Sequence, residues 1–217
     1  MSKILLSMAV IILMNSCRSL SYFQTPNDLR NISGKLFLTN GETIDGKLII
    51  SRNDFIGKEI KVYTPGHKAP LKYDLFDIKG YEVRGQYYEL KEIRGSIALH
   101  SNYSFMKRLT KPDSKIQLFE NTERITSTAN NSTTTHYETQ YYLQLPYETG
   151  DAVWTLGSSK FVPNFDEKMS KLVQDCELLA QKIADKKSGY FYAQISLSKE
   201  KKADVLWNII NEYNNCR

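Results

Sequence analysis

The sequence predicts an α+β fold, in which an antiparallel β-rich region (a sandwich, barrel or curved meander) precedes a C-terminal helix–strand–helix unit. Two observations carry this prediction. Short runs of β-branched and aromatic residues, separated by Gly, Pro and Asn turns, fill most of the chain up to Pro163. Beyond Pro163 the apolar residues recur with the period of a helix. The 217 residues suffice for one domain with a real core, or for two small ones.

The β-rich region is expected over residues 31–164. Asn40-Gly41 lies between two apolar runs and is a strong hairpin signal, because both residues tolerate a positive φ. Residues 126–135 contain only Thr, Ser, Ala and Asn, which predicts a mobile loop between two strands. The other expected strands are Ile60–Tyr63, Tyr81–Arg84, Tyr87–Ile93, Phe105–Leu109, Ile116–Phe119, Tyr137–Leu145 and Val153–Leu156.

The helix–strand–helix unit is expected over residues 165–217, packed on the β-rich region. Asn164 or Asp166 can cap a first helix, and Gly189 can end it. Tyr190–Leu197 has the composition of a strand, and Ser198 can cap the last helix. The apolar stripe of the first helix comprises Phe165, Met169, Leu172, Val173, Cys176, Leu179, Ala180 and Ile183.

The N-terminus has the layout of an export signal. Lys3 supplies a positive charge, Ile4–Met14 is apolar apart from Ser7, and Ser16 is a small residue at the end of the run. Eleven residues are too few to cross a hydrocarbon layer, which needs about 20 helical residues. The segment therefore predicts a signal peptide over residues 1–16 and not a transmembrane helix.

The run Leu13-Met14-Asn15-Ser16-Cys17 resembles the lipobox of bacterial lipoproteins, although that motif usually has Leu where Met14 stands. The resemblance implies diacylglyceryl attachment to the Cys17 thiol, cleavage before Cys17 and acylation of the new amine. The alternative is an ordinary signal peptide followed by a chance cysteine. Residues 17–30 are polar and without a period, and predict a tether between the anchor and the domain.

A second set of motifs extends this resemblance. The runs Phe105–Leu109, Ile116–Glu120 and Tyr141–Gln144, together with Asp175-Cys176 and Tyr213-Asn214-Asn215-Cys216, resemble uncharacterised envelope lipoproteins of Bacteroides-type bacteria. The resemblance implies an outer-membrane or periplasmic lipoprotein and carries no activity. Surface lipoproteins of such bacteria often have an acidic tract after the anchor, and residues 18–21 have none. We therefore expect an outer-membrane protein that faces the periplasm.

Cys176 and Cys216 remain in the mature domain beside the anchor. Both fall on apolar helical stripes, and the cell envelope is oxidising, which favours a disulfide between them. The alternative is two separate thiols, because spacing alone does not show whether the two Cα atoms come within the needed ~7 Å.

Neither a metal site nor a cofactor is expected. The three histidines, His67, His100 and His136, lie far apart and have no acidic neighbour at ligand spacing, and no Cys-x-x-Cys pair occurs. Each histidine is better explained as a surface or loop residue.

Catalytic residues are not expected either. Gly157-Ser158-Ser159 is better explained as a turn than as a nucleophile elbow. Asp166-Glu167 fits the N-terminal end of a helix, where the macrodipole favours acids, and Asp74 with Asp77 fits a turn. The sequence therefore favours a non-enzymatic protein.

The charge pattern argues against nucleic acid as a partner. The net charge of +5 falls to +4 when the signal is removed, because Lys3 is its only charged residue. The densest basic cluster, Lys199–Lys202, contains an acid of its own, whereas nucleic-acid sites have a concentrated basic stripe. Lys35–Ile50 does resemble the strand–turn–strand of Sm-like RNA-binding barrels, and we interpret this as a shared hairpin.

The 14 tyrosines are unusual, with two adjacent pairs at Tyr87-Tyr88 and Tyr141-Tyr142 that place one ring on each sheet face. Exposed rings could stack on sugars or peptides. The alternative is that tyrosine simply favours half-buried strands. The sequence thus favours a lipid-anchored, non-enzymatic binding or structural module with an unknown protein or glycan partner. A glycan-handling enzyme or accessory of the cell surface is the alternative.

Overall fold

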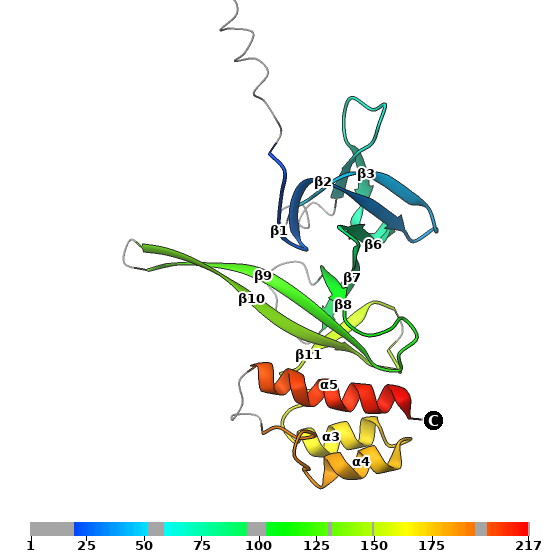
Figure 1. Cartoon of the computed structure of the whole chain (residues 1–217), viewed down its shortest axis with the longest axis vertical. Helices are drawn as coiled ribbons and strands as arrows, with labels where there is room; N and C mark the ends of the chain where they lie inside the picture. The colour runs from blue at the N-terminus through cyan, green and yellow to red at the C-terminus, as the bar shows by residue number, and fades with distance from the viewer. Residues whose placement is uncertain are drawn as a thin grey trace, which may run out of the picture.

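The computed structural model describes residues 20–51, 59–94, 103–129, 132–148, 150–193 and 199–216. These residues form one mostly antiparallel sheet of eleven strands with helices after it, so the predicted α+β class is confirmed. Figure 1 shows three tiers along the long axis of the molecule: the N-terminal strands, the middle strands and the C-terminal helices.

The first tier, which we call the N-terminal sheet, curls around its own core. Its strands are β1 (Tyr22–Thr25), β2 (Asp28–Leu38), β3 (Thr43–Ile50), β4 (Glu59–Tyr63), β5 (Leu71–Asp74) and β6 (Ile78–Val83). β2 pairs with β1, β3 and β6, and a 3-10 turn over Leu75–Asp77 connects β5 to β6. The predicted turn at Asn40-Gly41 joins β2 to β3, with Gly41 at φ 90°. The turn explanation for Asp74 also agrees, since its carboxylate accepts a hydrogen bond from the Phe76 amide at 2.9 Å.

The second tier is a closed ring of five strands. They are β7 (Gln86–Arg94), β8 (Tyr103–Arg108), β9 (Gln117–Ala129), β10 (Ser132–Gln144) and β11 (Ala152–Thr155). Neighbours in this series pair antiparallel, and β11 returns to pair parallel with β7 through residues 152–154 and 92–94. Side chains of alternate residues point into this five-strand ring. Its apolar interior is Ile93, Met106, Phe119, Tyr142 and Val153.

The prediction of a mobile loop over residues 126–135 is wrong for the described part of that range. Those residues continue β9 and β10. The two strands pair over their whole length, and their outer half projects as a two-stranded ribbon (Figure 1). Cross-strand hydroxyl pairs line it, as between Thr126 and Thr135 at 3.3 Å and between Ser127 and Thr134 at 2.9 Å. Threonine is β-branched and favours strands even where no core is built, so a run of threonines can form a paired ribbon.

The tether expected over residues 17–30 is also too long. Tyr22–Thr25 form β1, and β2 begins at Asp28. The turn between them is held by Asn27, whose side-chain amide donates to Ser104 at 2.9 Å and to Asn121 at 3.2 Å. The polar residues of this segment predict a linker, but the hydrogen bonds of Asn27 attach it to the ring.

The third tier consists of α3 (Phe165–Leu172), α4 (Glu177–Ala184) and α5 (Lys199–Asn215). The single helix expected up to Gly189 is therefore wrong: residues 173–176 interrupt the helix, and it ends at Ala184. Asn164 precedes α3 in the left-handed region and makes no side-chain cap. Of the strand expected over Tyr190–Leu197, residues 190–193 form no strand, and residues 194–198, including Ser198, lie outside the described residues.

The helices pack on the outer side of β9 and β10. Leu118 and Leu143 point away from the ring interior and join the apolar faces of α3, α4 and α5 in one core cluster. The last turn of α5 is fastened to the loop before β9: the Asn214 side chain accepts a hydrogen bond from the Ile116 amide at 3.0 Å and donates one to its carbonyl at 3.1 Å. This clamp and the apolar cluster make the helices part of the same folded body.

Two carboxylates also hold α5, which makes stability depend on pH. Asp175 accepts a hydrogen bond from the Tyr213 hydroxyl at 2.7 Å, and this bond, with a smaller effect of Lys115, lowers the pKa of Asp175. Glu212 accepts hydrogen bonds from Lys182 at 2.7 Å and from Tyr190 at 2.7 Å, which lower the pKa of Glu212.

Because both pKa values are lower in the folded than in the unfolded chain, the stabilisation is complete above the unfolded values of about 4 and is lost as the pH falls below them. We expect the urea midpoint to be steady between about pH 7 and 5 and to fall steeply below about pH 4. Asp175→Asn should flatten this fall, whereas Asp204→Asn, an exposed control on α5, should keep it. An unchanged acid slope in the Asp175 variant would contradict the role of this contact.

Candidate functional site

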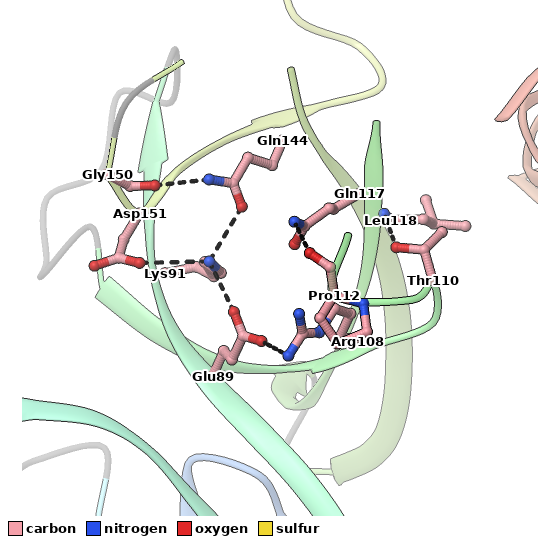
Figure 2. A network of polar contacts seen from close by, with 10 residues as sticks. All are labelled: Glu89, Lys91, Arg108, Thr110, Pro112, Gln117, Leu118, Gln144, Gly150 and Asp151. Carbon is pink, nitrogen blue, oxygen red and sulfur yellow. Dashed lines mark hydrogen bonds and ion pairs between the residues drawn. The ribbon is translucent and has the colours of Figure 1, made fainter. Parts of the chain in front are cut away.

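Two features of the strands stand out as candidates, and the first is a charged network inside the five-strand ring (Figure 2). Lys91 on β7 is 3% exposed, and Glu89 is 7% exposed. The Lys91 ammonium contacts Glu89 at 2.9 Å, the Gln144 side-chain oxygen at 3.1 Å and Asp151 at 3.4 Å. It also lies 4.7 Å from the centre of the Phe119 ring, and the other Glu89 oxygen pairs with Arg108.

This network has partners on four strands or their ends, so it ties the ring together. Gln144 on β10 donates its amide to the Gly150 carbonyl at 2.6 Å, just before β11, and accepts from Lys91 on β7. Arg108 comes from β8. The Lys91 ammonium thus has three oxygen partners, as many as it has N–H groups. A buried amine with all its donors occupied is suited to holding strands together and not to attacking a substrate.

Two tyrosines near the ring are held in their neutral form. Burial, reinforced by Glu123, raises the pKa of Tyr142 to about 12, and its hydroxyl donates to the Gln140 side chain at 3.0 Å. Burial, with a smaller effect of Glu89, raises the pKa of Tyr87 to about 12. Neither phenol can therefore serve as a base near neutral pH.

The second candidate, which we call the sheet-face groove, is an open hollow of about 690 Å³ on the N-terminal sheet. It crosses the middle of β2 and β3 and is bordered by the end of β6 and the residues that follow β4. Its lining residues are Ser33, Gly34, Lys35, Asp45, Gly46, Lys47, Tyr63, Thr64, Pro65, Glu82 and Arg84.

Two glycines shape this groove. Gly34 and Gly46 are direct cross-strand partners, and each lets a further strand approach closely. A methyl group on Gly34 would overlap the Glu82 carbonyl oxygen and lie 2.7 Å from a Val83 methyl. One on Gly46 would lie 2.6 Å from the Tyr63 carbonyl oxygen. Since the obstacles include backbone atoms, which cannot turn aside, the close approach of β6 to Gly34 and of β4 to Gly46 depends on these two glycines.

We expect Gly34→Ala to lower the free energy of unfolding by about 1–3 kcal/mol, because β6 must shift to admit the methyl group. Urea denaturation measures this. Gly157→Ala is the matched control: no atom lies within 4 Å of its added methyl group, so its midpoint should stay close to that of the wild type. Equal midpoints for the two variants would show that the close approach at Gly34 does not stabilise the sheet.

Of the charged residues of the groove, Lys35, Asp45, Lys47 and Arg84 are exposed and Glu82 is half-buried. Among the described residues, neither Lys35, Asp45, Lys47 nor Glu82 forms an ion pair within 4 Å, and Arg84 lies 5.6 Å from the centre of the Phe23 ring. The Thr64 hydroxyl is buried at the edge of the groove and has no hydrogen-bond partner in the described part of the chain. The groove therefore offers both hydrogen-bond donors and acceptors to a bound molecule.

The residues singled out in the sequence lie apart from both features. Cys17 and His100 lie outside the described residues. His67 is exposed in the turn after β4, and His136 is exposed on the ribbon. Cys176 and Cys216 are joined in a disulfide, with their Cα atoms 6.0 Å apart. In the parts of the chain that the structure describes, no three His, Cys, Asp or Glu side chains cluster as metal ligands would.

The turn at Gly157-Ser158-Ser159 and the carboxylate pair Asp166-Glu167 have structural surroundings in the described part of the chain. Ser158 lies in a turn after β11, where its amide donates to the Thr155 carbonyl at 3.0 Å, and its buried hydroxyl has no partner among the described residues. Asp166 pairs with Lys186 at 3.2 Å, near the start of α3.

Most of the tyrosines are buried or half-buried, as expected if tyrosine is frequent here because it favours half-buried strands. The rings of Tyr87 and Tyr88 do lie against different neighbours: Tyr87 packs edge-on against Phe37, and Tyr88 stacks on Tyr81. Three of the described tyrosines are exposed, namely Tyr63, Tyr137 and Tyr147, and of these Tyr63 alone lines the groove.

The chain matches no protein-family model, no curated protein and no solved structure. Within the described residues, none of the helices combines the length and the apolar character that spanning a membrane requires.

Proposed function

We propose that this protein is a lipid-anchored protein of the bacterial cell envelope whose β-rich domain binds a ligand or partner without converting it. The observation that supports binding is the sheet-face groove, which presents charged side chains and an exposed tyrosine to solvent on a sheet of fixed curvature. Binding sites commonly combine a preformed concave surface with a few polar groups that orient the ligand. The fully partnered Lys91 network fits a supporting role and not chemistry.

The anchor part of the proposal rests on the lipobox-like run that ends at Cys17. One acyl chain gives only marginal membrane binding, whereas two or three hold a protein firmly, at about 0.8 kcal/mol for each buried methylene. The second strand of the domain begins at Asp28, eleven residues beyond Cys17, so the domain would lie close to the membrane surface. We place it on the periplasmic side of the outer membrane.

Cell fractionation of wild type and Cys17→Ala tests the anchor. The wild type should sediment with membranes and resist a salt wash, and Cys17→Ala should not. Ser16→Ala, which keeps the thiol and a small residue before it, should behave like the wild type. If Cys17→Ala stays with the salt-washed membranes, lipid anchoring is refuted.

A further inference from the structure

The strands that carry the sheet-face groove have neighbours on both sides, and this limits what can bind there. β2 pairs with β1, β3 and β6, and β3, β4 and β6 each pair with two strands, so most of the backbone under the groove is engaged in the sheet. A peptide that binds by adding a strand needs a free sheet edge. A ligand in this groove is therefore recognised mainly by side chains.

The charge pattern narrows the ligand class. Lys35 pairs across the strands with Asp45 on one side and with Glu82 on the other, so acids flank it in both directions. A polyanion would meet these two carboxylates among the three cations of the lining, Lys35, Lys47 and Arg84, and so would find no surface of a single sign. Lys47 and Arg84, in turn, would repel a polycation. The groove thus suits a ligand that is uncharged but rich in hydroxyl groups, which both donate to carboxylates and accept from cationic side chains.

Tyr63 completes this arrangement. Its side chain is 38% exposed at the end of β4, beside Pro65, and Lys47 is its cross-strand partner. An aromatic ring is a rigid surface that combines an apolar face with a polar tip. The C–H face of a pyranose ring can stack on such a surface while its hydroxyls reach the charged groups around it.

Building on the proposed function, we infer that the sheet-face groove binds a neutral oligosaccharide, with Tyr63 as the stacking surface and Asp45, Glu82, Lys47 and Arg84 as hydrogen-bonding groups. The volume of about 690 Å³ lies within the range of small-molecule sites and has room for more than one sugar ring.

Isothermal titration of the unlipidated mature chain (residues 17–217 with Cys17→Ala) tests this inference. The probes are maltotriose, cellotriose, N,N′,N″-triacetylchitotriose and mannotriose as neutral trisaccharides, and trigalacturonate as an anionic one. We expect at least one neutral probe to bind with a dissociation constant of about 1 mM or below, and trigalacturonate to bind at least about tenfold more weakly.

Two tyrosine variants locate the binding. Tyr63→Ala should weaken the bound neutral probe about tenfold, which corresponds to roughly 1.4 kcal/mol. Tyr137→Ala removes a ring that is 57% exposed on the ribbon, outside the groove, and should leave the affinity unchanged. Circular dichroism should confirm that both variants are folded, and Tyr63→Phe, which keeps the ring, should retain most of the affinity.

The inference is overturned if no neutral probe binds, if trigalacturonate binds best, or if Tyr63→Ala and Tyr137→Ala have equal effects. None of these results removes the broader binding function. A photoreactive residue at position 63 that cross-links in cells while every trisaccharide fails to bind would reject sugar recognition and leave another ligand for the same groove.

Discussion

Glu89→Ala is expected to cause the largest loss of stability of any single charge removal in the ring, about 3–5 kcal/mol. Glu89 is the one acid that contacts both Lys91 and Arg108 among the described residues, and it is 7% exposed. Its removal leaves two cations close together, of which Lys91 is almost completely buried. Lys91 then keeps only the neutral Gln144 and the exposed Asp151 as partners, and a buried charge that loses its buried counter-ion costs far more than the intact pair contributes.

Urea denaturation of three variants measures this effect. Glu59→Ala is the control, because Glu59 also pairs with a lysine, at 3.1 Å, but in an exposed position where such a pair contributes at most about 1 kcal/mol. The third variant replaces all three charged residues together, as Glu89→Leu with Lys91→Met and Arg108→Met. It should lower the free energy of unfolding less than Glu89→Ala alone does. If Glu89→Ala and Glu59→Ala shift the midpoint equally, the network does not hold the ring.

Loss of the Cys176–Cys216 disulfide is expected to be nearly as costly. The bridge closes a loop with a sequence separation of 40, for which the chain-entropy relation gives about 4 kcal/mol at 25 °C. It joins the residue before α4 to the residue after α5 and so fixes the end of the chain, which would otherwise fray. We expect the double variant Cys176→Ala with Cys216→Ala to remain folded but to unfold at clearly lower urea concentration.

Two measurements check this bridge in the Cys17→Ala background. Alkylation of the oxidised, unfolded chain should modify no thiol, and the same treatment after reduction should modify two. A reducing agent should lower the midpoint of this chain but leave that of the double variant unchanged. Two modified thiols without reduction, or a midpoint that reduction does not move, would contradict the bridge.

The sequence predicted the fold class and most strands because their apolar residues repeat with the right period. It placed the hairpin at Asn40-Gly41, where the residues themselves require a positive φ. It did not reveal the closure of the ring, since the pairing of β11 with β7 joins segments about 60 residues apart and depends on no local motif. The sequence does not indicate the break in the first helix either, because Val173 and Cys176 are buried and continue the apolar stripe across it.

Neither candidate feature could have been found from the sequence. Glu89 and Lys91 alternate with Leu90, a pattern typical of a strand with one solvent-exposed face. In the structure all three residues are buried, because the closed ring covers the second face of β7. The groove gathers short segments of four strands whose polar residues look like an ordinary solvent-exposed face. Gly34 and Gly46 were the available signal: glycine inside a strand often marks a place where another backbone approaches closely.

Photo-cross-linking in cells tests most directly that the sheet-face groove is a binding surface. Benzoylphenylalanine is introduced at position 63 in the groove or, as the control, at position 137 on the ribbon, two positions where the native tyrosines are exposed. Irradiation of growing cells should give discrete adducts in the membrane fraction from position 63 and none from position 137. No adduct from position 63, or the same adducts from both positions, would contradict the proposed function.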